Sequence, residues 1–479
     1  MSKRGLSCVA CLLVPFLGSL ACGSAAEDPL DPGGTAGKGA SSAGTGSGVG
    51  GTSPGAGGSS AQPTAGTSNA GASAGSSPVA GSSSGGSASG GGGNPSGGSA
   101  SGGTSGGSAS GGGTSGGAGT TGGTGGTGPS TADGTGAPET TPGGYGKGTT
   151  GGGTVKAVKV DSLAAMQSAI DGYSSGGLVL EYTGKFDFKS ITDPCVQHTK
   201  DAQTLEIKNK SDISILGADG STANFGIHIA ASSSNIIIRN MTIGLTPGGD
   251  ASDIISIEGM SGGVPKKIWI DHNEMFTSLA TCAGAGDTAF DGMLDIKKGA
   301  DSVTVSYNYM HDHHKVSLNG YTDTDDEVRH VTFHHNLFER VGSRVPLQRH
   351  GFSHVVNNYF LDVATSGINV RMGGYSLVEA NYFEKVKNPV TARDSDAVGF
   401  WELRANNLKS AADVAPGNTF GITWSAGDSG TVNATDWKTT AAYPEQLGYD
   451  FAAQPFQCVH DGLRAAAGAG KGLVTLKCK

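Results

Sequence analysis

An asparagine-centred repeat constrains the fold of this chain more than any other feature of its sequence. Its copies centre on Asn240, Asn273, Asn308, Asn336, Asn358 and Asn381, and Asn406 begins a weaker seventh copy. Three positions before each asparagine lies an apolar residue, namely Ile237, Ile270, Val305, Phe333, Val355 and Val378. Two positions after it, five of the six copies carry Met275, Met310, Phe338, Phe360 and Phe383. Spacings of 22 to 35 residues are typical of solenoid coils with loops of variable length.

The positions of the apolar residues indicate a bend at each asparagine. They lie at an odd offset before it and an even offset after it, whereas a continuous strand keeps one parity because its side chains alternate between faces. Asparagine tolerates the left-handed conformation that a tight bend requires. Stacked coils would place the amides in a hydrogen-bonded ladder. We therefore predict an all-β fold, a parallel β-helix with coils about 4.8 Å apart, rather than a β-sandwich with chance Asn-aromatic pairs.

Composition divides the chain into a low-complexity part and a globular part. Most of the 84 glycines lie between Gly33 and Gly153, among Ser, Thr and Ala. Such a segment buries too little apolar surface to offset the entropy of ordering it, so we predict a disordered linker over residues 23–153. Residues 154–479 suit one large all-β domain. Asp161 and the amphipathic segment 162–170 predict a short capping helix over the first coil.

Residues 1–22 have the features of an export signal. Lys3 and Arg4 precede an apolar run that ends in small residues before Cys22. The run is too short for a permanent membrane helix. The sequence SLAC at its end resembles a bacterial lipoprotein cleavage site, which favours lipidation of Cys22 over ordinary cleavage. We expect a secreted or cell-envelope-anchored protein.

Four further cysteines lie in the globular part, at Cys195, Cys282, Cys458 and Cys478. Three pairings are open to them in an exported domain. We prefer Cys458–Cys478, which would staple the C-terminal tail, together with Cys195–Cys282. The chain contains no Cys-x-x-Cys motif, and this disfavours a zinc site built from thiolates.

Three polar segments hold the residues that could carry chemistry. Asp253, Asp287 and Asp291 would form an oxygen-rich cluster of the kind that calcium prefers, although acidic loop residues are more often simply solvated. Lys315, Arg344 and Arg349 have the opposite charge and, taken alone, would more often form surface ion pairs. A histidine set invites a zinc interpretation, but neighbours on alternating strand faces cannot all point at one metal: His311, His313, His314, His334 and His335.

At this point the sequence resembles the pectate lyase family over essentially all of residues 154–479. The strongest matches are WIDHNEMF, DGMLDIKKGADSVTVSYNYMHDHHKVSLNG, RVPLQR and HVVNNYF. The resemblance implies a right-handed parallel β-helix, in agreement with the repeat. It also implies a calcium-dependent enzyme that cleaves polygalacturonate by β-elimination, as a monomer and without a nucleic-acid partner.

The resemblance assigns a role to each candidate residue. Asp253, Asp287 and Asp291 match the primary calcium ligands, Arg344 the general base, and Lys315 and Arg349 residues that bind substrate carboxylates. Ala251 stands where relatives can carry another aspartate, and Asp250, one position away, is the alternative ligand.

Three other functions fit the sequence less well. A pectin lyase acts on the methyl-esterified polymer, for which an acidic metal cluster would be pointless. A polygalacturonase needs a pair of carboxylates astride the glycosidic bond, in a pattern that we do not find. A non-catalytic polysaccharide-binding β-helix would not require Arg344, Lys315 and the acidic cluster together. Endo or exo action, chain-length preference, methyl-ester tolerance and the role of the linker stay open.

Overall fold

The structure is a computed structural model that describes residues 132–285, 289–408, 420–424, 432–433, 443–444 and 446–479, apart from the side chains of Asp250, Val432 and Asn433. The predicted signal segment, Cys22 and the linker up to residue 131 lie outside the described residues. Asp287 lies outside them too. None of the helices in the described ranges is long and apolar enough to cross a membrane.

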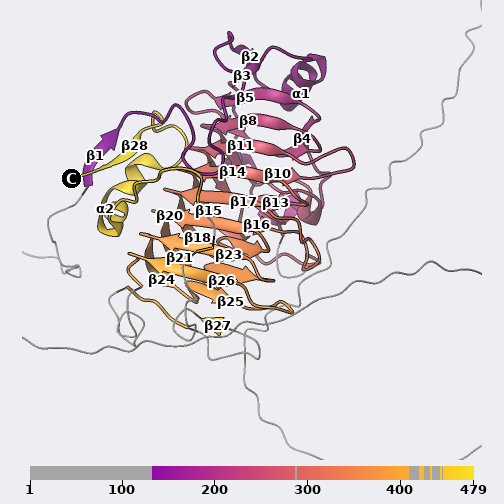
Figure 1. Ribbon diagram of the computed structural model, residues 1–479. Helices are drawn as coiled ribbons and strands as arrows, with labels where there is room; N and C mark the ends of the chain where they lie inside the picture. Colours follow the sequence, from indigo (N-terminus) through magenta and orange to yellow (C-terminus); the bar gives the residue numbers. More distant parts are fainter. Residues whose placement is uncertain (1–131, 286–288, 409–419, 425–431, 434–442, 445) are drawn as a thin grey trace, which may run out of the picture. The chain divides into compact units, whose positions relative to one another are not determined.

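Within the described ranges, three parallel sheets wind into a right-handed β-helix, which confirms the predicted fold (Figure 1). Ten strands form sheet I, in the order β2 (Val158–Val160), β3 (Leu178–Tyr182), β5 (Ser211–Gly217), β8 (Ser234–Arg239), β11 (Lys266–Asp271), β14 (Asp301–Ser306), β17 (His330–His334), β20 (Phe352–Val356), β23 (Tyr375–Glu379) and β26 (Phe400–Arg404).

Sheet II follows sheet I along each coil, and its seven described strands are β6 (Thr222–Ala223), β9 (Thr242–Gly244), β12 (Glu274–Phe276), β15 (Tyr309–Lys315), β18 (Leu337–Ser343), β21 (Tyr359–Val363) and β24 (Tyr382–Val386). Sheet III completes the coil with nine described strands: β4 (Thr204–Lys208), β7 (Gly226–Ala230), β10 (Ile255–Glu258), β13 (Leu294–Lys297), β16 (Leu318–Asn319), β19 (Leu347–Arg349), β22 (Ile368–Arg371), β25 (Val390–Ala392) and β27 (Val432–Asn433). Only β27 joins its neighbour antiparallel among these nine strands.

The predicted asparagine ladder forms at the turn from sheet I to sheet II. Asn308 is typical: its Oδ1 accepts hydrogen bonds from the backbone N–H and the side chain of Asn273, while its own amide donates to Asn336. The same pattern continues through Asn358 and Asn381 to Asn406, which confirms the seventh copy. These amides are buried, and each satisfies its neighbour in the next coil.

The predicted place of Asn240 in the repeat is wrong by one position. In the strand register, Ile238 pairs with Ile270, so Met241 rather than Asn240 is the partner of Asn273. The N–H of Met241 accordingly donates to Asn273 Oδ1. The signal was present in the sequence, because this copy alone lacks the Met or Phe two positions after its asparagine.

The prediction that the asparagine itself makes the bend in each coil is also wrong. The left-handed conformation belongs to the residue before each ladder asparagine, with φ of 51° at His272, 50° at Tyr307 and 54° at His335. The asparagine itself is then free to direct its amide along the stack. Inside the turn, the predicted Met and Phe positions pair in register from Met275 to Phe383 and form one buried column.

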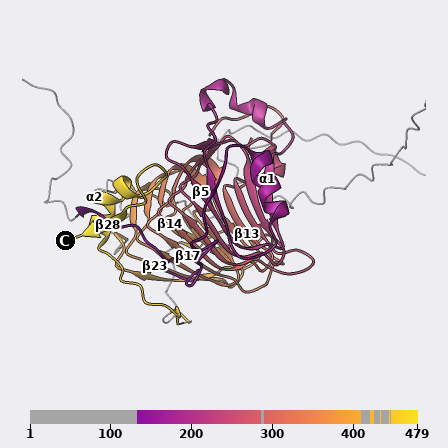
Figure 2. The same cartoon turned by 90° about the horizontal axis from the view of Figure 1, so that it is seen from above.

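Helix α1 (Leu163–Gly172) packs against β3 and β4 at the N-terminal end of the β-helix, as predicted (Figure 2). It buries Met166 and Ile170. Its N-cap is Ser162 rather than Asp161, since the Ser162 side chain accepts a hydrogen bond from Ala165 N.

The predicted linker boundary is wrong for residues 132–153. Strand β1 (Ala132–Gly136) pairs antiparallel with the C-terminal strand β28 (Thr475–Cys478), and Figure 1 shows the two side by side. The following segment, which we call the N-terminal strap (residues 137–153), crosses the outer face of sheet I. Backbone N–H groups of the strap donate to hydroxyls on successive strands: Tyr145 to Thr332, Gly146 to Thr304 and Gly152 to Ser214.

Glycine in the strap serves close packing rather than flexibility. A Cβ on Gly146 would lie 2.9 Å from Thr304 Oγ1, and one on Gly152 would lie 2.3 Å from the carbonyl oxygen of Leu178. Composition cannot separate these glycines from linker glycines, because both uses require the absence of a side chain.

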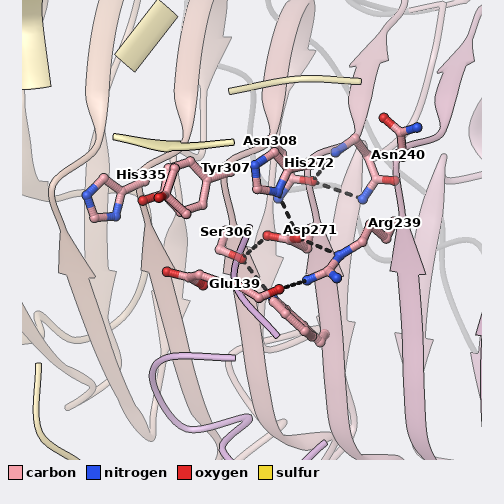
Figure 3. A network of polar contacts seen from close by, with 12 residues as sticks. Glu139, Arg239, Asn240, Asp271, His272, Ser306, Tyr307, Asn308 and His335 are labelled. Carbon is pink, nitrogen blue, oxygen red and sulfur yellow. Dashed lines mark hydrogen bonds and ion pairs between the residues drawn. The ribbon is translucent and has the colours of Figure 1, made fainter. Parts of the chain in front are cut away.

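The strap is also held by a buried polar network on sheet I (Figure 3). The Arg239 guanidinium stacks 3.9 Å from the Trp269 ring, pairs with Asp271 at 2.7 Å and donates to the carbonyl of Glu139 at 3.2 Å. The Glu139 carboxyl interacts electrostatically with the charges of this network, although its Oε2 has no hydrogen-bond partner among the described residues. Its burial, together with the charge of Asp271, raises the pKa of Glu139 to about 7.

The C-terminal region covers the neighbouring face of the β-helix. Helix α2 (Phe456–Ala466) buries Val459 and Leu463 against Leu337 and Tyr359. The preferred disulfide pairing is confirmed: Cys458 joins α2 to β28 through Cys478, and Cys195 joins Cys282. Short 3₁₀ helices occur at Phe188–Ser190, Pro194–Gln197 and Gly249–Ala251.

Candidate active site

The candidate active site lies at the corner where sheet II passes into sheet III. Strands β10, β13, β16 and β19 are successive neighbours in sheet III, and each begins two or three residues after a charged candidate residue. We call these residues the corner row: Asp253, Asp291, Lys315 and Arg344. Residues far apart in sequence therefore occupy equivalent places on four consecutive coils.

Two buried carboxylates face each other across Gly292. The Oδ1 atoms of Asp253 and Asp295 each lie 2.6 Å from the position that a Cβ on Gly292 would occupy, so no side chain fits there. The Lys297 ammonium lies 2.8 Å from Asp253 and 3.7 Å from Asp295. Although burial opposes it, Lys297 holds the pKa of Asp253 below its usual value, whereas burial and the charge of Asp253 raise the pKa of Asp295.

Asp291 completes the acidic group on the side nearer to Lys315. Lys315 Nζ lies 3.1 Å from Asp291 Oδ1, and both side chains are partly exposed. Burial, followed by the charge of Asp253, raises the pKa of Asp291. The backbone of Asp291 is held by His313, whose Nε2 donates to the Asp291 carbonyl at 2.9 Å. Burial lowers the pKa of His313 to about 3, so this imidazole is neutral at ordinary pH.

Arg344 lies in an irregular corner. Lys315 pairs with Ser343 at the end of sheet II, and Leu318 pairs with Leu347 at the start of sheet III. The coil of Arg344 therefore has one more corner residue than the preceding coil. Arg344 takes a left-handed φ of 58°, and its carbonyl accepts a hydrogen bond from Ser317 N at 2.8 Å. The charge of Arg344 acts against the rise in the pKa of Asp295, so the two groups interact electrostatically.

Arg349 is buried in an ion pair on strand β19. Its side chain is only 3% exposed, and its Nε lies 2.6 Å from Asp323 Oδ1. Its Nη1 donates to the carbonyl of Gly320 at 3.1 Å. Asp323 is in turn bound by the hydroxyl of Ser395. The predicted contact of Arg349 with substrate therefore stays a prediction.

The acidic group suits a hard cation in donor type. Asp253, Asp291 and Asp295 supply only carboxylate oxygens, the ligands that calcium prefers. In the described ranges, no three carboxylate, histidine or cysteine side chains converge closely enough to bind a metal in this structure. Asp287 and the side chain of Asp250 lie outside those ranges, so their predicted roles stay predictions.

Sequence reasoning assigned Asp295 no role in the site and missed Lys297. Both lie on β13, where Leu294 and Ile296 alternate with them and fill the core. That alternation was the available signal, because it sends the side chains of Asp295 and Lys297 to the outer face beside Asp253. The pairing of Asp295 with Ser256 in β10 places it next to the Asp253 coil.

Comparison with known proteins agrees with this geometry. The sequence profile of the family described as pectate lyase matches residues 74–472. The chain belongs to the pectate lyase family. Pectate lyase B of Dickeya chrysanthemi is 42% identical over 307 residues, which cover 62% of this chain and 79% of the relative. Pectate lyase 1 of Pectobacterium carotovorum is 43% identical over 66% of this chain and 85% of the relative.

Solved structures of family members share the fold. Pectate lyase II from Xanthomonas campestris pv. campestris is 55% identical, with a TM-score of 0.66 over 69% of this chain and 99% of that chain. Pectate lyase C from Erwinia chrysanthemi is 39% identical, with a TM-score of 0.65 over 71% of this chain and 99% of that chain. The family match and the corner row together make this chain a polysaccharide lyase.

Proposed function

We propose that this protein is a pectate lyase that cleaves α-1,4-linked polygalacturonate by calcium-assisted β-elimination, with Arg344 as the general base. The observation that carries the proposal is the corner row, in which two carboxylates are followed by two cationic side chains on consecutive coils. Related structures support the substrate and the metal: pectate lyase C has been solved with pentagalacturonic acid and, separately, with calcium.

For the calcium ligands we propose Asp253, Asp291 and Asp295. The first two were predicted from sequence, and Asp295 is supported by its place opposite Asp253 across Gly292. Bound there, calcium would neutralise the substrate carboxylate and so make the adjacent C5 proton more acidic. Asp287 remains a predicted further ligand.

The chain's own residues would perform the remaining steps. Lys315 is partly exposed beside Asp291, where its ammonium can bind the galacturonate carboxylate and stabilise the charge that develops on it. Arg344 would take the C5 proton onto a guanidine nitrogen. The electron pair left behind forms the C4–C5 double bond while the bond from C4 to the glycosidic oxygen breaks. That oxygen takes a proton from water.

Arginine is a poor base at neutral pH because its guanidinium is almost always protonated. We therefore expect an alkaline activity optimum. An optimum well below pH 7 would count against Arg344 as the base.

The deciding assay is ultraviolet absorbance on polygalacturonate, since only elimination leaves a conjugated double bond. We expect absorbance to rise for the wild type with calcium, and to stay flat with a chelator or for Arg344→Ala. Arg340→Ala is a matched control, because Arg340 lies on β18 and pairs with Asp312 instead of the acidic group. Activity that persists with a chelator would indicate a pectin-lyase-like enzyme, and a wild type with no activity would favour a binding β-helix.

We further propose that the protein acts as a monomer outside the cytoplasm, either secreted or anchored through Cys22. The location rests on the export features of residues 1–22, and the monomeric state rests on the family resemblance alone. Lipid mass on the mature N-terminus would distinguish the anchored form from the secreted form.

A further inference from the structure

A cavity of about 530 Å³ opens at the N-terminal end of the β-helix. Its volume lies in the range of small-molecule sites. Its walls combine apolar and polar side chains, among them Phe186, Phe225, Lys200 and Gln203. None of these residues belongs to the corner row.

The cavity lies on the same line as the corner row. In sheet III, Ile227 of β7 pairs with Ile255 of β10, so Phe225 lies opposite Asp253. Thr204 of β4 pairs with Gly226 of β7, so Gln203 lies one coil further. At about 4.8 Å per coil, these two cavity residues follow Asp253 at about 5 and 10 Å. Gly226 lies directly against the Asp253 coil, since a Cβ there would be 2.5 Å from the Asp253 carbonyl oxygen.

The outer wall of the cavity includes the segment around the 3₁₀ helix Pro194–Gln197, which is fixed by a disulfide and by hydrogen bonds. Cys195 in the 3₁₀ helix Pro194–Gln197 is bonded to Cys282. Gln197 Nε2 donates to the Leu245 carbonyl at 3.0 Å, and Gly248 N donates to the Gln197 carbonyl at 3.1 Å. The disulfide and both hydrogen bonds fix this wall beside the loop that leads to Asp253, so the cavity is a preformed feature.

The chemistry of the lining suits an acidic sugar. Lys200 is the one cation among the lining residues of the described structure, and its side chain is exposed. Asp193, the one carboxylate in the lining, caps the 3₁₀ helix by accepting from Cys195 N at 2.9 Å. Phe186 offers apolar surface to the face of a pyranose ring, and Gln203 offers an exposed amide to its hydroxyls.

We propose that this cavity is a distal subsite for a galacturonate residue, with Lys200 binding the carboxylate of that residue. The inference rests on the proposed function, because it assumes that a polygalacturonate chain lies along the corner row. Substrates long enough to reach from Arg344 to Lys200 gain binding energy there, and short ones do not.

The test compares Lys200→Ala with wild type on short and long oligogalacturonates. A charge-assisted contact on an exposed side chain is expected to change kcat/KM by about tenfold on long substrates. The same variant should leave kcat/KM on the shortest cleavable substrate unchanged. Lys208→Ala is the matched control, because Lys208 is an exposed lysine of the same coil outside the cavity lining. It should change neither value.

Calorimetry separates failure of the subsite from failure of the lyase assignment. In the Arg344→Ala background, long oligogalacturonates should bind about tenfold more weakly when Lys200 is also replaced. Equal affinities with and without Lys200, or an equal loss on short and long substrates, would overturn the subsite. A Lys200 effect of the same size on fully methyl-esterified oligomers would overturn the carboxylate contact. Absence of elimination products with the length-dependent binding intact would overturn the lyase function alone.

Discussion

Replacing Glu139 by glutamine should change how the stability of the protein depends on pH. Glu139 is the strap residue whose backbone carbonyl accepts a hydrogen bond from Arg239, beside Asp271 (Figure 3). Its Oε2 is buried without a hydrogen-bond partner among the described residues. Burial first, and then the charge of Asp271, raises its pKa from 4.5 to about 7, although His272 and Arg239 act in the opposite direction.

The sign follows from proton binding. Between about pH 4.5 and 7 the folded chain keeps Glu139 protonated while the unfolded chain has already ionised it. The free energy of unfolding therefore falls as pH rises through this window, and the penalty is complete above pH 7. The shift corresponds to about 3 kcal/mol. Because Glu139 keeps part of its surface exposed, we expect on the order of 2 kcal/mol.

Urea unfolding at about pH 5 and pH 8.5 measures this effect. The stability advantage of Glu139→Gln over wild type should be about 2 kcal/mol larger at the higher pH than at the lower pH, because only wild type loses stability as pH rises through this window. Glu181→Gln makes the same chemical change on β3, where Glu181 pairs with Lys159 on the surface, and serves as the control. A stability difference between Glu139→Gln and wild type that is the same at both pH values would refute the reasoning.

Three further predictions concern the ladder, the acidic group and a buried histidine. Asn336→Ala should lower the free energy of unfolding by about 3–5 kcal/mol in urea, because it leaves buried partners in the neighbouring coils unsatisfied, whereas Asn240→Ala, outside the ladder, should cost clearly less. Asp295→Asn should weaken calcium binding by at least tenfold in calorimetry, and an unchanged affinity would remove Asp295 from the ligand set, with Asp301→Asn as a control that leaves affinity intact. Stability should also fall as pH drops below about 6.5 toward 3, because the unfolded chain protonates His313 before the folded chain does; a His313→Gln variant with the same acid slope as wild type would contradict this.

The local sequence pattern was sufficient to predict the stacked coils. Each coil repeats an apolar residue, a turn and an inward Met or Phe, so the pattern can be recognised without knowing which coils are neighbours. The ladder from Asn273 to Asn406 and the column from Met275 to Phe383 follow from it. The Asn240 copy failed where the pattern was incomplete, because a one-residue shift reverses every side chain between core and surface.

The sequence predicted that the site is a row of charged residues, but it did not predict every residue that belongs to it. Charged residues before strands of consecutive coils were expected to form a row, and Asp253, Asp291 and Lys315 do so. Asp295 and the buried pairing of Arg349 with Asp323 depend on contacts between segments distant in sequence. Register and side-chain direction decide those contacts, and neither is encoded in spacing alone.

The sequence by itself determined that this chain builds stacked β coils with a charged row along one corner. Only the tertiary structure decided where the domain begins. Residues 132–153 have the composition of a linker, yet β1 pairs with β28 and the strap lies close against sheet I. A glycine is equally suited to a flexible chain and to a close contact, so the surface it meets determines which role it takes.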